Sequence, residues 1–427
     1  MELKKYKLGE ILDVTRGASL SGEFYATEGK YIRLTCGNFD YQNNCFKENK
    51  SKDNLYYIGD FKPEFLMEEG DIITPLTEQA IGLLGSTAII PESGKYIQSQ
   101  DVAKIICKEE LLDKDFTFYL ISSTLVKQQL SAAAQQTKIR HTSPDKIRDC
   151  TVWIPELAEQ KRIGKLLRSL DRKIELNRAI NQNLEAMAKQ LYDYWFVQFD
   201  FPNEEGKPYK SSGGAMVWNE KLKREIPEEW DISLIKDIAN TYSGGTPQST
   251  NIEYYNNGEI AWINSGELNS PIITKTTNYI TKSGLENSSA KLYPSNSILV
   301  AMYGATAGKV SLLTFEACSN QAVCGVIPTI ENMTYYVYLH ISSLYNHFIK
   351  LSTGSARDNI SQDTIRNILL PIPTRNILQL FDEKIESIYQ TIVNNYQQID
   401  SLTKQRDELL PLLMNGQVSV NSDLSDD

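Results

Sequence analysis

The chain has 427 residues, 41% hydrophobic and 23% charged, a balance typical of globular proteins that excludes disordered and collagen-like chains. Its 54 acidic and 44 basic residues give a net charge of −10, which taken alone argues against nucleic acid as a partner, because duplex-binding proteins usually present a basic surface. No apolar run approaches the roughly 20 residues that span a bilayer, and the polar start MELKKYKLGE is unlike a signal peptide, so we expect a soluble, cytoplasmic protein with no membrane partner.

The chain contains an internal repeat. Matched positions lie between 218 and 229 residues apart, and a drifting offset is what loop insertions produce between two copies of one fold. The matches include Tyr6 with Trp230, Gln100 with Gln321, and Ile147 with Ile365. The sequence therefore predicts two homologous halves, near 1–200 and 230–415.

Each half opens with a mixed globular domain. Strand-like runs such as 71–74 and 297–300 are followed by glycine-rich turns. The strand patterns do not alternate with helical patterns at regular spacing, so we predict an α+β fold rather than a doubly wound sheet. The two globular domains are expected at 1–155 and 230–373.

A different period follows each domain. From Ile163 to Trp195, and again from Phe381 to Leu413, seam residues recur every three or four positions, and the second series is the first shifted by 218 residues. A 3.5-residue period sustained over more than four heptads predicts a coiled coil. We therefore expect helices at 156–200 and 374–415 that pair as a long antiparallel two-helix coiled coil, with the globular domains related by a pseudo-twofold axis. The alternative is two separate helices, each packed on its own domain.

Polar residues mark the seam and the connections. Asn177, Asn181 and Asn395 fall at seam positions, where a buried amide sets the register of a coil at a cost in stability. Residues 201–229, rich in proline and glycine, are expected to form the returning linker. Residues 416–427 are expected to form an acidic tail.

An aromatic cluster ends the first helix. Tyr192, Trp195 and Phe196 are too apolar for an exposed end of a coil, so they either cap its core or dock a partner. Because Tyr and Trp are frequent anchors of protein interfaces, we assign these three residues to a partner interface.

The sequence shows no catalytic constellation. The segment YGATAGKV at 303–310 looks faintly like a phosphate loop, but it has only three residues between its glycines and a valine where the magnesium ligand should stand. No G-x-G-x-x-G run and no N-P-P-Y or D-P-P-Y tetrapeptide occurs. Six cysteines without a C-x2-C pair, and only three histidines, predict buried free thiols and no metal site. A non-enzyme that holds two similar domains a fixed distance apart is suited to two-part sites on a polymer, of which duplex DNA is the commonest.

Four segments carry a resemblance to a known family. They are PELAEQKRIGKLLRSLDRKIELNRAINQNLEAMAKQLYDYWFVQFDFP (155–202), LTKQRDELLPLLMNGQVSV (402–420), YSGGTPQSTNIEYYNNGEIAWINSGEL (242–268) and RGASLSGEFY (16–25). The first two resemble the central and distal conserved regions of the specificity subunits of type I restriction–modification systems. The other two resemble the openings of target-recognition domains in that family, so the resemblance covers essentially the whole chain.

The resemblance implies a non-catalytic subunit that reads double-stranded DNA. Each globular domain would read one half of a bipartite target, and the paired helices would set the spacer and dock two modification subunits. No cofactor is expected in this chain: S-adenosylmethionine would belong to the modification subunits, and ATP and Mg²⁺ to two restriction subunits. The alternatives are the specificity subunit of a type IIB-like system and, from a different class, a two-headed coiled-coil protein scaffold. A self-contained methyltransferase is disfavoured by the missing tetrapeptide.

Candidate DNA contacts are side chains on glycine-rich or polar loops, favoured where they fall at matching places in both halves, since a bidentate arginine on such a loop suits guanine. They are Arg16, Lys138 and Arg140 in the first half, and Gln248, Tyr303, Lys309 and Arg357 in the second. For each residue the alternatives are a solvated surface position and a phosphate contact.

The acidic excess is unevenly distributed. Residues 1–155 hold 19 basic and 22 acidic residues, and residues 209–373 hold 12 and 14, so each recognition domain is only mildly negative. Residues 374–427 hold 4 basic and 9 acidic residues. We infer that the modification subunits neutralise much of the DNA phosphate charge and that this chain alone binds DNA weakly.

Overall fold

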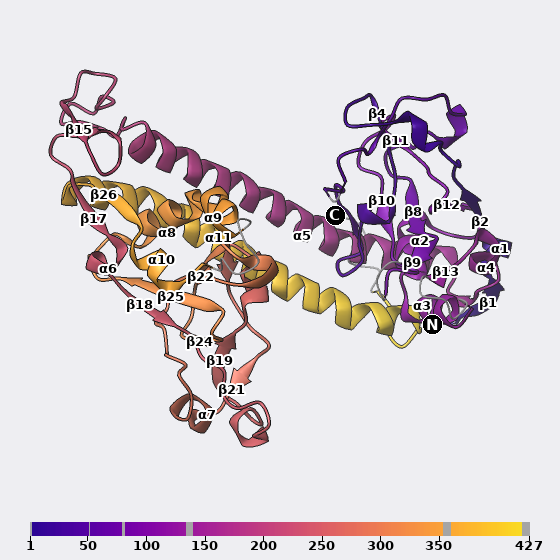
Figure 1. Ribbon diagram of the computed structural model, residues 1–427. Coiled ribbons are helices and arrows are strands. Elements are labelled where there is room, and N and C mark those ends of the chain that lie inside the picture. The colour runs from indigo at the N-terminus through magenta and orange to yellow at the C-terminus, as the bar shows by residue number, and fades with distance from the viewer. Residues whose placement is uncertain (1, 51, 79–81, 134–139, 353–359, 421–427) are drawn as a thin grey trace. The chain divides into compact units, whose positions relative to one another are not determined.

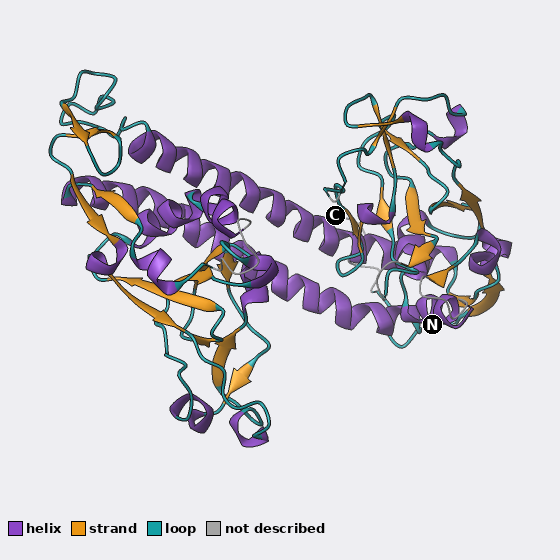
Figure 2. Cartoon of the chain, in the orientation of Figure 1, coloured by secondary structure: helices purple, strands orange, loops and turns teal. Residues whose placement is uncertain are grey.

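The computed structural model describes residues 2–50, 52–78, 82–133, 140–352 and 360–420. The chain divides into two units, which Figure 1 colours by residue number: unit 1 is Met1–Glu175 with Ser401–Asp427, and unit 2 is Leu176–Asp400. Helices and strands are mixed in both units (Figure 2), which confirms the predicted α+β class. Within the described ranges, none of the helices combines the length and apolarity that crossing a membrane requires.

A four-stranded antiparallel sheet forms the centre of unit 1. Its strands lie in the order β10 (Ala88–Ile89), β8 (Ile72–Pro75), β12 (Val102–Cys107) and β2 (Leu12–Arg16). Helices α2 (Lys114–Ile121) and α3 (Thr124–Ala133) contribute to the same hydrophobic cluster as this sheet. The cluster joins Val14, Ile72 and Ile105 of the sheet to Phe116 and Val126 of the helices, so one face of the sheet is covered.

Apart from two short helices, the remaining elements of unit 1 are strands of a second four-stranded sheet and of three two-stranded sheets. They are β1 (Lys4–Lys7), α1 (Leu8–Ile11), β3 (Tyr25–Ala26), β4 (Tyr31–Arg33), β5 (Phe39–Asp40), β6 (Cys45–Phe46), β7 (Tyr56–Tyr57), β9 (Thr77–Glu78), β11 (Tyr96–Ile97), β13 (Arg140–His141), α4 (Pro144–Arg148) and β14 (Thr151–Ile154). Strand β1 pairs antiparallel with β14, so the first and last strands before the long helix close the domain.

Unit 2 has a five-stranded central sheet. Its strands lie in the order β18 (Ala239–Ser243), β25 (Val323–Pro328), β22 (Ile298–Ala301), β23 (Val310–Leu313) and β20 (Ile272–Ile273). The first four pair antiparallel, as in unit 1, and β20 adds a parallel strand at the end. Helix α8 (Thr334–Ser343) shares the hydrophobic cluster of this sheet through Tyr336 and Val337.

The other elements of unit 2 include a hairpin and a separate three-stranded sheet. They are β15 (Met216–Asn219), β16 (Arg224–Pro227), β17 (Asp231–Leu234), α6 (Ile235–Ile238), β19 (Ile260–Ile263), β21 (Tyr279–Ile280), α7 (Lys282–Glu286), β24 (Cys318–Ser319), α9 (Tyr345–Ser352), α10 (Gln362–Arg366) and β26 (Leu369–Ile372). Strand β17 pairs with β26 as β1 pairs with β14, which matches the predicted repeat.

The segment expected to be a linker, 201–229, is folded onto unit 2. Strands β15 and β16 pair antiparallel as a hairpin, and Ile226 is buried in the cluster of the central sheet. The Phe201 ring stacks on that of Trp230, with centroids 5.1 Å apart. The segment is therefore a packed part of the domain and not an extended connection, because its few apolar residues find partners in the core.

Two long helices follow the globular domains. Helix α5 (Leu157–Tyr192) begins just after Pro155 and ends in a π-helical turn, Asp193–Val197, and α11 is Arg375–Met414. In unit 1, Asp171 of α5 contacts Arg406 of α11. In unit 2, Asn181 contacts Asn395. Also in unit 2, Asn177 of α5 contacts Gln398 of α11, so residue numbers rise along one helix as they fall along the other and the helices pair antiparallel as predicted.

Candidate nucleic-acid interface

Strands β2 and β8 of the central sheet of unit 1 end where β12 begins. Ala103 of β12 pairs with Arg16, the last residue of β2, and with Thr74 of β8. Beyond this point Leu76 donates its backbone N–H to the carbonyl of Asp101 (2.8 Å), which continues the pairing toward β9. Strand β9 in turn pairs with β13. The polar residues collected here are named the unit 1 edge: Arg16, Glu78, Gln100 and Arg140.

The two arginines of the unit 1 edge are held differently. Arg16 is exposed, and its Nε donates to the backbone carbonyl of Gln100 (2.9 Å), which fixes the guanidinium through its inner nitrogen. Arg140 faces Glu78, with Nη1 and Oε2 3.7 Å apart. The Glu78 carboxylate is buried and also accepts the backbone N–H of Gly82 (2.9 Å), so Arg140 partly serves to balance a buried charge.

The central sheet of unit 2 ends in the same way. Val323, at the start of β25, pairs with Ala301, the last residue of β22, and accepts the backbone N–H of Gly244 just after β18 (3.0 Å). The N–H of Ala301 donates to the carbonyl of Lys309 (2.9 Å), the residue before β23. The polar residues collected here are named the unit 2 edge: Thr246, Gln248, Tyr303, Lys309 and Gln321.

Hydrogen bonds orient part of the unit 2 edge. The hydroxyl of Thr246 donates to Oε1 of Gln321, and Nζ of Lys309 donates to the side-chain oxygen of Asn269. Gln248, Tyr303 and Gln321 are exposed. The unit 2 edge therefore offers mainly neutral amide and hydroxyl groups, whereas the unit 1 edge offers guanidinium groups.

A glycine lies at the same place in both edges. A Cβ on Gly17, just after β2, would lie 2.2 Å from the carbonyl oxygen of Gln98, and one on Gly244 would lie 2.2 Å from that of Asn320. Because these contacts are with backbone, only glycine fits at either position. The two edges are therefore built on the same backbone arrangement.

The structure brings together most of the predicted DNA contacts. Arg16 and Arg140 lie in the unit 1 edge, and Gln248, Tyr303 and Lys309 in the unit 2 edge. Lys138 and Arg357 lie outside the described residues. Whether any of them contacts DNA stays a prediction.

Sequence reasoning overlooked four members of these edges: Glu78, Gln100, Thr246 and Gln321. The signal for Gln321 was present, because the repeat pairs it with Gln100, and a polar residue at the same place in both halves is a candidate contact. Glu78 has no such signal, since its role depends on Arg140 in a strand 62 residues further along the chain.

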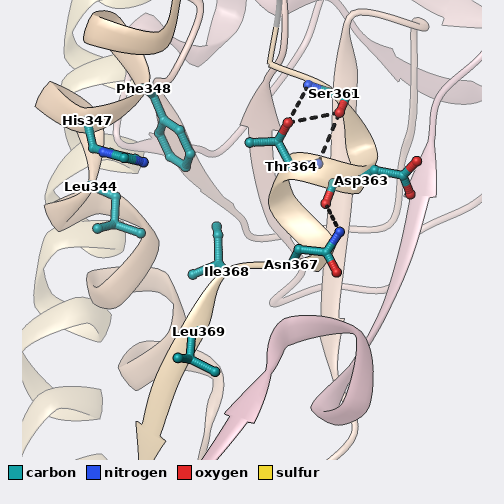
Figure 3. A pocket seen from close by; sticks show the side chains of 9 residues that line it. All are labelled: Leu344, His347, Phe348, Ser361, Asp363, Thr364, Asn367, Ile368 and Leu369. Carbon is teal, nitrogen blue, oxygen red and sulfur yellow. Dashed lines mark hydrogen bonds between the residues drawn. The ribbon is translucent and has the colours of Figure 1, made fainter. Parts of the chain in front are cut away.

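A cavity of about 670 Å³ lies between α9, α10 and β26 of unit 2. Figure 3 shows its lining: Leu344, His347, Phe348, Ser361, Asp363, Thr364, Asn367, Ile368 and Leu369. The hydroxyl of Ser361 accepts the backbone N–H of Thr364 (3.0 Å), which makes it the N-cap of α10. The Ser361 hydroxyl therefore caps α10, and these nine residues do not form a nucleophile–base pair.

The predicted register residues lie in the seam of unit 2. Asn395 Nδ2 donates to Oδ1 of Asn181 (2.8 Å), and Asn181 Nδ2 donates to the carbonyl of Ile392 (3.3 Å). Asn177 Nδ2 donates to Oε1 of Gln398 (3.2 Å). All three asparagines are buried, so each buried amide is partnered across the helix pair. Their effect on register stays a prediction.

The aromatic cluster is a core and not a surface. Tyr192, Trp195 and Phe196 are buried in the hydrophobic cluster of unit 2, which corrects their assignment to a partner interface. The Tyr192 hydroxyl lies 2.9 Å from Nδ1 of His340. Burial lowers the pKa of His340 to about 4, so at neutral pH this ring is uncharged and suits the apolar surroundings. The π-helical turn that follows α5 aims these rings into the domain.

The cysteines are free thiols. Burial raises the pKa of Cys36 and Cys150 to about 11 and that of Cys318 and Cys324 to about 12, which makes them poor nucleophiles at neutral pH. In the part of the chain that the structure describes, no group of three or more His, Cys, Asp and Glu residues is placed to hold a metal ion.

Comparison with known proteins decides the family. The model of the type I restriction modification DNA specificity domain matches residues 1–186 and 227–409. The chain belongs to this family. Its function is that of a type I specificity subunit, the recognition of DNA sequence.

Individual relatives agree with this assignment. The chain is 25% identical to the type I restriction enzyme MjaIX specificity subunit of Methanocaldococcus jannaschii over 326 residues, which cover 75% of this chain and 73% of that one. It is 26% identical to the HindI specificity subunit of Haemophilus influenzae over 377 residues, which cover 76% and 81%. The crystal structure of a type I restriction–modification S subunit from M. genitalium shares the fold, with a TM-score of 0.61, 15% identity and 97% and 96% coverage.

Proposed function

We propose that this specificity subunit reads a bipartite duplex DNA target, with one half-site read at the unit 1 edge and the other at the unit 2 edge. The proposal rests on one observation. The unit 1 edge and the unit 2 edge share a backbone arrangement but carry different side chains. Arg16 in β2 takes the place of Ser243 in β18, since each precedes the close-packed glycine. Because the groups differ, the two half-sites are expected to differ in sequence.

The long helices are proposed to set the unread spacer. Helix α5 is continuous from Leu157 to Tyr192 and α11 from Arg375 to Met414, and each contributes residues to both units. Paired helices are stiff, with a rise of about 1.5 Å per residue, so their length translates into a fixed number of base pairs.

An exposed apolar stripe on α5 supports docking of modification subunits. Leu176, Ile180 and Met187 are 59%, 36% and 54% exposed, and spacings of four and seven residues place them on one face of the helix. Exposed apolar side chains gathered in this way mark protein interaction sites. Two modification subunits would supply S-adenosylmethionine and methylate one adenine in each half-site, and two restriction subunits would use ATP and Mg²⁺. This chain would bind no cofactor and carry out no catalysis itself.

Exchange of residues 1–155 for another first recognition domain should change one half-site only. The chimera would be expressed with the modification subunit, and N6-methyladenine mapped by single-molecule sequencing. The wild-type chain with its modification subunit should methylate one bipartite motif. The complex of the chimera should methylate a motif that keeps one of the two half-sites and the same spacer. A change in both half-sites would contradict the proposal, and so would a wild-type complex that methylates no motif.

Insertion of one heptad in both helices, beside Asn181 in α5 and beside Asn395 in α11, should lengthen the spacer. Seven residues add about 10 Å, which corresponds to about three base pairs at 3.4 Å each. Methylation should move to a motif with the same half-sites and a longer spacer, or disappear from the original motif. Alanine substitutions at Lys161, Lys173, Gln182 and Asn183, which are exposed polar positions of α5 outside the apolar stripe, would serve as a control. Undiminished methylation of the original motif by the assembled insertion variant would refute the spacer role.

A further inference from the structure

Arg16 is the arginine of the first recognition domain that is both exposed and without a carboxylate partner among the described residues. The other three arginines of residues 1–155 are engaged within the fold: Arg33 is buried over the Tyr25 ring, Arg140 faces Glu78, and Arg148 binds Asp13 and Asp145. The terminal donors of Arg16 therefore face no carboxylate among the described residues and remain for a ligand.

The anchoring of Arg16 favours one base. Its Nε is used by the backbone carbonyl of Gln100, which leaves the two terminal nitrogens as a pair of donors in one plane. Guanine presents two acceptors in one plane, O6 and N7, at its major-groove edge, and the guanidinium fork matches them. Adenine offers an acceptor beside a donor, which this fork does not match.

The same place in unit 2 holds no arginine. Ser243 stands there, and its hydroxyl donates to Oε1 of Gln362 (3.0 Å). Gln362 is itself tied to β18 through its Nε2, which donates to the carbonyl of Thr241 (2.8 Å). Both side chains are therefore used within the fold. The exposed Gln321 occupies the position of Gln100 in unit 1. The carbonyl of the next residue, Ala322, accepts the backbone N–H of Met302 (2.8 Å), just as the carbonyl after Gln100 accepts that of Leu76 (2.8 Å).

The anchoring of Gln321 favours adenine. The Thr246 hydroxyl donates to its Oε1, which leaves one lone pair on that oxygen and both N–H groups of Nε2. An amide with one acceptor and one donor side by side matches N6 and N7 of adenine. Gln248 is also exposed, but among the described residues no side-chain hydrogen bond orients it, so ordering it on a base would cost more entropy.

We propose that the two recognition domains read different bases: Arg16 of the unit 1 edge reads a guanine in one half-site, and Gln321 of the unit 2 edge, positioned by Thr246, reads an adenine in the other. This assignment rests on the proposed function, because it requires that each edge meets one half of the target.

Arg16→Ala and Gln321→Ala test the assignment and act as controls for each other. Each full-length variant would be expressed with the modification subunit, and methylated motifs mapped by single-molecule sequencing. Arg16→Ala should relax one G·C position in one half-site, with the preference for guanine falling about 10-fold or more, and Gln321→Ala should do the same for one A·T position in the other half-site. The half-site that stays intact shows that the complex is assembled.

Purified complexes would give a second measurement that does not need methylation. Competition between duplexes that differ at one base pair should show that Arg16→Ala loses discrimination at its G·C pair, while Lys62→Ala, which removes an exposed cation of the same domain, keeps it. Thr246→Val should weaken discrimination at the A·T pair less than Gln321→Ala does, because the amide remains but loses its anchor.

Two results would overturn the assignment. Weaker binding to all sequences with unchanged discrimination would make Arg16 a phosphate contact. Unchanged discrimination in Gln321→Ala would remove Gln321 as a reader. Failure of the proposed function looks different, because the wild-type complex would then show no bipartite motif at all.

Discussion

Replacement of Phe196 with alanine should lower the free energy of unfolding of unit 2 by about 3–5 kcal/mol, because a buried aromatic ring is removed from a packed core. The ring is 2% exposed, and its centroid lies 4.6 Å from those of both Tyr336 and Phe381. Urea denaturation followed by tryptophan fluorescence would measure the loss, since the Trp195 and Trp230 rings lie 6.2 and 5.9 Å away and report on this core.

Tyr194→Ala provides the matched control. Tyr194 belongs to the same π-helical turn but is 39% exposed, so its truncation should change the free energy of unfolding by less than about 1 kcal/mol. An opposite pattern, in which Phe196→Ala leaves the denaturation midpoint unchanged and weakens binding of the modification subunit, would restore the interface assignment.

The long helices could be predicted from the sequence because their signal is local. A 3.5-residue spacing of seam residues needs no knowledge of the partner helix to be seen. The repeat was visible for a related reason, since two copies of one fold keep apolar residues at matched positions. The same local reasoning failed at the aromatic cluster, because a core and a docking surface both select Tyr, Trp and Phe. Only the packing of residues 192–196 against α8 and α11 separates the two.

The recognition edges were predicted in part. Arg16 and Tyr303 were found because each stands directly before a glycine in a segment expected to be a loop, and polar residues in such loops often bind ligands. The anchoring of Arg16 by Gln100, and of Gln321 by Thr246, joins residues more than 70 positions apart. Such pairs depend on strand register, which a single sequence does not reveal. The hairpin of β15 and β16 was missed because Gly213 and Gly214 just before it, and Pro227 at its end, suggested a linker.

The seam departs from the predicted pattern at several positions, one of which carries a buried charge. The heptad spacing places Leu170 in the seam, but Leu170 is only half-buried and the neighbouring Asp171 is buried instead. The cause lies on α11, where Arg406 contacts Asp171 with Nη1 and Oδ1 2.8 Å apart. Tyr119 of α2 also donates its hydroxyl to this carboxylate. A charged residue thus takes a seam position because its partners are supplied from two other elements.

Arg406→Leu should be strongly destabilising for unit 1. The side chains of Arg406 and Asp171 are only 9% and 10% exposed, so removing the cation leaves a buried carboxylate without its counter-charge, at a cost of about 3–5 kcal/mol. Lys404→Ala is the control on the same helix. Lys404 pairs with Glu408, but the two side chains are 76% and 65% exposed, so this change should cost less than about 1 kcal/mol.

The double variant Asp171→Leu/Arg406→Leu separates the buried charge from the lost contact. Two apolar residues at facing seam positions avoid desolvating any charge, so much of the stability lost in Arg406→Leu should return, and a double-mutant cycle should give a coupling well above the roughly 0.5 kcal/mol expected of independent sites. A double variant as unstable as the sum of the single changes would show that the pair is not coupled. If stability returns while the spacer of the methylated motif becomes heterogeneous, the ion pair acts on register, as the asparagines of unit 2 are predicted to do. If the spacer stays single, packing alone fixes the register in unit 1.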